Sequence, residues 1–211
     1  MRRRRCAWAA FHAAIAVAPL AEAPVRAAEF IWDGATNLSG WAATVQTASG
    51  DLQNNWGRTG SSPPAPGAAD SAIFPIDATT TGAATVAGLH NFATLTYGQG
   101  ILAVSGPVLE NSNTIIFAGD GAGQIFGYDD VLAYPAATTL FGGGTLSMVE
   151  INESRLTGSG ALTNADNIIR GQGLIDVASF VNQATLRAEG GELWVESVVD
   201  NSAGEIIVAS D

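Results

Sequence analysis

Lysine is absent from this chain of 211 residues, and cysteine occurs once, at Cys6. Histidine occurs only at His12 and His90. From residue 28 onward the chain therefore has no thiol and one imidazole, which excludes disulfides, a cysteine nucleophile and a zinc site built from His and Cys. The sequence also lacks a G-x-S-x-G elbow and a phosphate-binding glycine loop. We expect no metal, no cofactor and no catalytic residue.

Positive charge is scarce as well. The formal net charge of the chain is −11. Without residues 1–27, four arginines face nineteen acidic residues, a formal charge of −15. Nucleic acid and anionic lipid repel such a chain. We therefore expect no nucleic-acid partner, and a surface whose charge supports solubility.

The N-terminal residues predict export. Arg2 to Arg5 form a basic start, an apolar stretch runs from Cys6 to Leu20, and Val25-Arg26-Ala27 suits signal peptidase. Residues 1–27 are predicted to be a signal peptide that is cleaved after Ala27, by either the general secretory or the twin-arginine route. The apolar stretch is shorter than the roughly 20 residues of a membrane span. An uncleaved N-terminal anchor is the alternative.

The remaining composition favours strands and tight turns. Gly, Ala, Ser, Thr and Asn are abundant, and charged residues make up only 14% of the chain, a mixture that disfavours helices. Because disulfides are excluded, stability must come from packing. A stack of repeats is one solution, since each repeat buries its apolar face on its neighbours.

Repetition is clearest in the last third of the chain. Asn164, Asn182 and Asn201 each begin a similar segment, and they are 18 and 19 residues apart. The apolar pairs Leu174-Ile175 and Leu193-Trp194 lie between them and are 19 apart. Upstream, the segment from Asn111 repeats the asparagine pattern, and residues 98–102 repeat the pattern of residues 171–175. Periods near 20 residues are typical of solenoids, in which one repeat forms one coil.

Alternation within a coil predicts which side chains point inward. Leu193 and Val195 share one face of a strand, and Trp194 and Glu196 share the other. Asparagines at one point of successive coils can form a hydrogen-bonded ladder. An antiparallel sandwich with asparagine-containing turns is the alternative. We expect a β-solenoid over residues 77–211.

Residues 28–76 form a tryptophan-rich region, predicted to cap the first coil. Trp32, Trp41 and Trp56 lie within it, and Trp194 lies in the repeats. The first three rings could cover the open end of the stack. Alternatively, all four tryptophans are candidate ligand contacts, because aromatic rings stack on sugars.

Other motifs fit turns better than chemistry. Asp129-Asp130 is an adjacent acidic pair of the kind that glycosidases use, but no arginine or histidine is near it in sequence. Residues 119–123 resemble one fragment of a calcium-binding repeat without the further aspartates that a cage requires. Residues 142–144 and His90 are expected in turns.

Several motifs together resemble a known family. Trp32-Asp33-Gly34, Trp41, Asn55-Trp56 and residues 66–74 resemble the start of many bacterial autotransporter passenger and autotransporter-associated β-helix proteins. In that family a W-D-G opening and an N-W precede P-G-x-x-D-x-A-x-F, and glycine-rich coils follow. The resemblance covers most of the chain after residue 27. It implies a right-handed parallel β-helix displayed outside the cell.

The resemblance also implies a longer protein. Family members usually end in a translocator barrel of the outer membrane, and this chain stops at Asp211 within a strand-like segment. Residues 57–65 are less regular than the family pattern. We expect residues 28–211 to be the N-terminal part of a passenger, with membrane association only through a missing barrel.

The predicted function is that of an exported, non-enzymatic β-solenoid of the bacterial cell surface, structural or adhesive, with an unknown surface, glycan or protein ligand. One alternative is a carbohydrate-active β-helix, a lyase or glycosidase, which requires carboxylates and a basic residue together on consecutive coils. The four arginines are too scattered in the sequence to favour it. The other alternative is a secreted carbohydrate-binding β-sandwich.

Overall fold

The computed structural model describes residues 28–33, 41, 44–46, 52–56, 59–60, 65–98, 100–117, 130–149 and 154–209. The predicted signal peptide lies outside these residues. Every regular element in the described part of the chain is a strand. That part accordingly contains no helix able to cross a membrane. The all-β prediction is confirmed.

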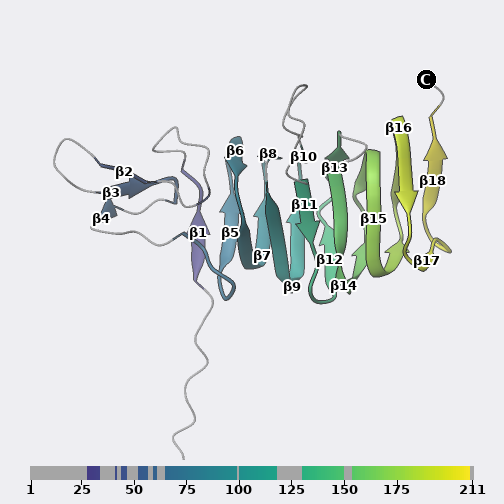
Figure 1. Cartoon of the computed structure of the whole chain (residues 1–211), viewed down its shortest axis with the longest axis horizontal. Coiled ribbons are helices and arrows are strands. Elements are labelled where there is room, and N and C mark those ends of the chain that lie inside the picture. The colour runs from purple at the N-terminus through teal and green to yellow at the C-terminus, as the bar shows by residue number, and fades with distance from the viewer. Residues whose placement is uncertain are drawn as a thin grey trace, which may run out of the picture.

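The strands form a parallel β-solenoid of about six turns (Figure 1). Its coils have three faces. The first face consists of β1 (Glu29–Ile31), β5 (Ser71–Phe74), the second half of β7 (Ala84–Asn91), the second half of β9 (Ile101–Asn111), β12 (Thr138–Phe141), the second half of β14 (Ser154–Asn164), the end of β15 (Ile168–Asn182) and β17 (Val199–Asp200).

The second face consists of β6 (Ala78–Thr81), β8 (Thr94–Gly98), β10 (Thr114–Phe117), β13 (Thr145–Met148), the starts of β15 and β16 (Thr185–Val195), and β18 (Glu205–Val208). The third face consists of the starts of β7, β9 and β14, β11 (Asp130–Ala133), the middle of β15 and the end of β16. Pairing is parallel throughout these faces, so the antiparallel sandwich alternative is wrong.

A small antiparallel sheet lies at the N-terminal side of the stack (Figure 1). It consists of β2 (Thr44–Gln46), β3 (Leu52–Asn54) and β4 (Thr59–Gly60). It falls within the predicted capping region. Strands β1 and β5 also fall within residues 28–76 and pair with the solenoid sheet.

Coil length varies around the predicted period. Successive coils place equivalent inward residues 20, 31, 23, 17 and 20 positions apart, at Leu95, Ile115, Leu146, Ile169, Leu186 and Ile206. The coil of 31 residues includes residues 118–129, which lie outside the described part. Although the coils differ in length, their described strands keep parallel register.

The predicted alternation is confirmed, with one correction. Leu193 and Val195 face inward and pack against the core, whereas Trp194 faces outward. The internal repeat predicted that Leu174-Ile175 and Leu193-Trp194 are equivalent in successive coils, and this prediction is wrong by one residue. Leu174 pairs with Trp194, because the β15–β16 register shifts between Gly171 and Gly173. Glycine adopts φ values of 112° and 136° there, which side chains disfavour.

The interior is a continuous apolar column. Its members lie on the inward rows of all three faces, including Leu102, Leu132, Leu156 and Ile175, which follow one another on the third face. Each is completely buried. Burial of a leucine side chain stabilises the fold by about 2 kcal/mol. The stack thus obtains without disulfides the core that the sequence predicts.

A ladder of asparagine amides runs inside the first-face corner. Asn91 Nδ2 donates to Asn111 Oδ1 (2.9 Å), and Asn111 Nδ2 donates to Asn167 Oδ1 (3.0 Å). The ladder continues from Asn164 Nδ2 to Asn182 Oδ1 (2.9 Å) and from Asn182 Nδ2 to Asn201 Oδ1 (2.7 Å). The predicted ladder is confirmed. Three of these rungs tie one coil to the next where the chain turns, and the Asn111–Asn167 rung spans the coil that contains residues 142–144.

Glycines interrupt this ladder at one coil. Residues 142–144 form the bend between β12 and β13 that the sequence predicts. A Cβ atom on Gly144 would lie 2.4 Å from the carbonyl oxygen of Asn111. The bare backbone therefore passes close to Asn111, whose Nδ2 donates to the carbonyl of Thr145 (2.9 Å) and reaches Asn167 beyond it.

Candidate functional site

Three of the four candidate tryptophans lie inside the molecule. The rings of Trp32, Trp41 and Trp56 are buried together against Phe74. Ring centroids are 4.7 Å apart for Trp41 and Trp56, 5.1 Å for Trp32 and Trp56, and 5.4 Å for Trp56 and Phe74. Trp56 Nε1 donates to the carbonyl of Trp41 (2.8 Å). These rings offer no free face on which a sugar could stack.

This aromatic cluster lies next to the start of the asparagine ladder. Phe74 pairs with Asn91 in the first-face register, so an aromatic ring takes the place that asparagine takes in later coils. Asn91 Oδ1 is buried and has no hydrogen-bond partner among the described residues. The ladder therefore begins where the aromatic cluster ends.

Trp194, the fourth candidate, is different. Its side chain is 54% exposed on the third face, and its Nε1 donates to Glu192 Oε2 (2.9 Å). It pairs with Leu174, which pairs in turn with Arg155. Trp194 thus points outward in a row with Leu174 and Arg155. It is distant in sequence from the three buried tryptophans.

Two arginines that are separated in sequence meet on the second face. Arg170 pairs with Arg187 in the register of β15 and β16, and Ser147 precedes them in the same outward row. Glu189 contacts both guanidinium groups, at 3.4 Å to Arg170 Nη1 and 2.8 Å to Arg187 Nε. Two of the four arginines that are scattered in the sequence therefore lie side by side in the fold.

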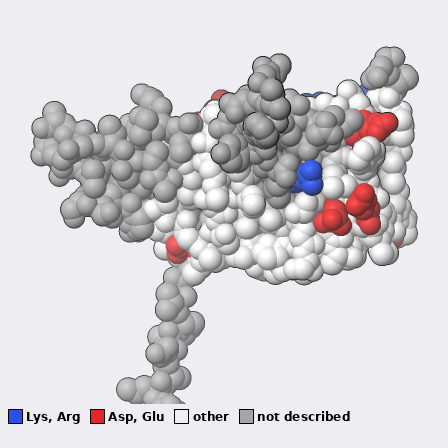
Figure 2. All heavy atoms as spheres, in the orientation of Figure 1, with Lys and Arg blue, Asp and Glu red and all other residues white. Residues whose placement is uncertain are grey.

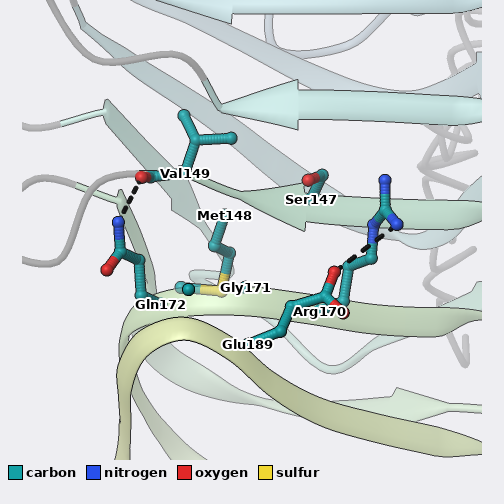
Figure 3. A pocket seen from close by; sticks show the side chains of 8 residues that line it. Ser147, Met148, Val149, Arg170, Gly171, Gln172 and Glu189 are labelled. Carbon is teal, nitrogen blue, oxygen red and sulfur yellow. Dashed lines mark hydrogen bonds and ion pairs between the residues drawn. The ribbon is translucent and has the colours of Figure 1, made fainter. Parts of the chain in front are cut away.

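Ser147, Arg170 and Glu189 border a groove of about 400 Å³ (Figure 3). Arg170 and Glu189 lie at one end, linked by their ion pair. At the other end Gln172 Nε2 donates to the carbonyl of Val149 (2.6 Å). Gly171 lies between the two ends. Reasoning from the sequence missed the groove, because Ser147, Arg170 and Glu189 become neighbours only through coil register.

His90 is not in a turn, contrary to the sequence prediction. It lies within β7, faces outward, and its Nδ1 is 2.8 Å from Glu110 Oε2. Glu110 is its partner in the register of β7 and β9. The imidazole therefore forms a cross-strand pair, a common way of stabilising neighbouring strands.

The remaining candidates give no site. Residues 119–123 and Asp129 lie outside the described part of the chain, and Asp130 begins β11. The described residues contain no cluster of three or more His, Cys, Asp or Glu side chains that could bind a metal. Among the residues described around the groove, Glu189 is the one carboxylate, whereas glycosidases use two.

Charge is sparse on the visible surface. Figure 2 shows acidic atoms gathered over the C-terminal coils and few basic atoms. Asp200, in those coils, has its pKa held below the usual value by hydrogen bonds from the backbone and the side chain of Ser202. The same end exposes apolar side chains, including Val198, Ile206 and Val208.

Comparison with protein-family models, with curated proteins and with solved structures finds no match to this chain.

Proposed function

We propose that this chain is an exported, passenger-like β-solenoid of the bacterial cell surface, with a structural or adhesive role and no catalytic activity. One observation supports the proposal above the others. The coils stack in register over about six turns, so outward side chains form straight rows with a spacing of about 4.8 Å. A rigid body with such rows can present a surface to a partner without changing shape.

The N-terminal residues support export. Residues 1–27 have the basic, apolar and small-residue order of a secretory signal. The absence of cysteine from residue 28 onward removes any risk of wrong disulfides during export. The resemblance of residues 32–74 to passenger proteins points to the same compartment.

The tryptophan cluster is proposed to cap the stack. Trp32, Trp41 and Trp56 pack against Phe74 at the N-terminal end, where an uncovered coil would expose apolar side chains and unpaired strand edges. Buried rings suit this structural role better than ligand binding.

A non-catalytic role is supported by the chemistry of the groove. Arg170 and Arg187 are both engaged by Glu189, and the described residues that line the groove include no second carboxylate. Acid–base hydrolysis of a glycoside requires two such groups.

Export is tested by expressing the full chain in a Gram-negative host beside a variant that lacks residues 2–27. We expect the full chain outside the cytoplasm with Ala28 as its N-terminus, identified by mass spectrometry of the fractionated protein. We expect the shortened variant to remain in the cytoplasm with a cytoplasmic marker enzyme. Cytoplasmic retention of an uncleaved full chain would contradict the proposal.

A further inference from the structure

The groove beside Arg170 is preformed by backbone geometry. Gly171 has φ 112°, and a Cβ there would lie 1.8 Å from the carbonyl oxygen of Met148. Gly190, which also lines the groove, has φ 75°. Both glycines therefore line the groove with backbone alone. Because strands of the sheet fix this backbone, a ligand would not have to order it.

The polar groups of the groove combine donors with acceptors. Arg170 lies 3.4 Å from Glu189 through Nη1, and its guanidinium group carries further N–H donors. Glu189 supplies acceptor oxygens, and Ser147 contributes a hydroxyl from the preceding coil. Vicinal hydroxyls of a sugar both donate and accept hydrogen bonds, so they match such a mixture.

The groove also has an apolar part. Val149 is 37% exposed beside Gly171, and its carbonyl accepts the hydrogen bond that fixes the Gln172 amide. Figure 3 shows Val149 and Gln172 at the end away from the Arg170–Glu189 pair. A pyranose ring has an apolar C–H face and a hydroxyl edge. The end of the groove at Val149 suits the C–H face, and the end at the Arg170–Glu189 pair suits the hydroxyl edge.

Charge decides between uncharged and anionic ligands. Glu189 lies against both arginines and offsets part of their positive charge. The chain as a whole has a formal net charge of −11, so a polyanion approaching the groove would be repelled over long range. An uncharged ligand meets no such repulsion.

We propose that this groove binds an uncharged oligosaccharide that lies along the stack. Rows on consecutive coils are about 4.8 Å apart, which is close to the length of one sugar unit in an extended chain. The ligand then contacts Ser147, Arg170 and Glu189 in turn, from three consecutive coils. The site specifies a ligand class for the adhesive role proposed above, and its biological meaning rests on that proposal.

The test is NMR titration of the ¹⁵N-labelled full chain with cellotetraose, maltotetraose, mannotetraose and tetra-N-acetylchitotetraose, each uncharged. At least one of them is expected to shift the amide signals of Gly171, Gln172 and Gly190. Tetragalacturonate, the anionic comparison, is expected to shift them less. Export is measured without any sugar, so failure here is distinguishable from failure of the proposed function.

Substitutions in the groove identify the side chains that contact the sugar. Glu189→Gln and Arg170→Gln are each expected to weaken binding about tenfold, because each removes hydrogen bonds to a charged group. Glu196→Gln removes the same charge as Glu189→Gln from an exposed position outside the groove and is expected to leave binding unchanged. The site assignment is overturned if no uncharged sugar shifts these amides. Larger shifts of these amides with tetragalacturonate than with any of the uncharged sugars would also overturn it, since the groove would then be an anion site.

Discussion

Two buried tyrosines differ in whether the hydroxyl group has a hydrogen-bond partner. The hydroxyl of Tyr134 is buried without a partner among the described residues, whereas the hydroxyl of Tyr97 donates to the carbonyl of Gly82. We expect Tyr134→Phe to stabilise the fold by about 1 kcal/mol, since it removes an unsatisfied polar atom. Tyr97→Phe should destabilise it by about 1 kcal/mol. Urea unfolding at neutral pH measures both, and equal signs would contradict the prediction.

Tyr134 also predicts a response to alkali. Burial raises the pKa of this phenol well above its ordinary value of 10.0. Below that pH the phenol is neutral in the folded and unfolded chain. Above it the unfolded chain ionises first, so the free energy of unfolding falls as pH rises. Tyr134→Phe should reduce this fall. Unfolding curves of both proteins at pH 7 and at about pH 10.5, near the reference pKa, test this. If Tyr134→Phe leaves the difference in the free energy of unfolding between the two pH values unchanged, Tyr134 is excluded as a cause.

The asparagine ladder makes a third prediction at the scale of residues. Asn111 accepts from Asn91 and donates to Asn167 and Thr145. Asn111→Ala leaves buried partners without hydrogen bonds, and we expect a loss of about 3 kcal/mol. Asn113, two residues away, is exposed, and Asn113→Ala should cost less than about 0.5 kcal/mol. Similar losses in the two variants would show that the ladder contributes little.

At the scale of elements, the corner of β15 requires glycine. Gly171→Ala would place Cβ 1.8 Å from the carbonyl oxygen of Met148, so backbone must move. We expect it to cost about 3 kcal/mol. Gly143 also has positive φ, 73°, but no atom within 4 Å of a new Cβ. Gly143→Ala should therefore cost only about 1 kcal/mol. Thermal unfolding of both variants separates steric contact from backbone conformation alone, and equal losses would contradict the steric explanation.

At the scale of the whole molecule, each coil contacts mainly its neighbours, so a local loss should stay local. Trp56→Ala removes the central ring of the aromatic cluster and is expected to cost about 3–5 kcal/mol at that end. Hydrogen exchange should accelerate in β1, β5 and β7, while β15 and β16 keep their protection. Trp194→Ala, at an exposed ring, is the control and should leave exchange unchanged. Uniform acceleration along the chain after Trp56→Ala would show that the stack unfolds as one unit.

Much of the architecture could be predicted from local pattern. The spacing of Asn164, Asn182 and Asn201 and the alternation around Leu193 predicted parallel coils, inward rows and an amide ladder. These features repeat along the chain, so the sequence carries several copies of the same signal. His90 was placed wrongly because a lone polar residue beside asparagine has the composition of a turn, whereas its cross-strand partner Glu110 is twenty positions away.

The sequence by itself determined the all-β class, the solenoid and the charge, because composition and period are properties of the chain alone. Tertiary structure decided which distant side chains meet. Coil lengths from 17 to 31 residues set the register, and a one-residue shift between Gly171 and Gly173 decides that Leu174 lies beside Trp194. The same register brings Ser147, Arg170 and Arg187 into one row around Glu189. No fixed period along the sequence could have indicated that groove, since its geometry depends on how unequal coils stack.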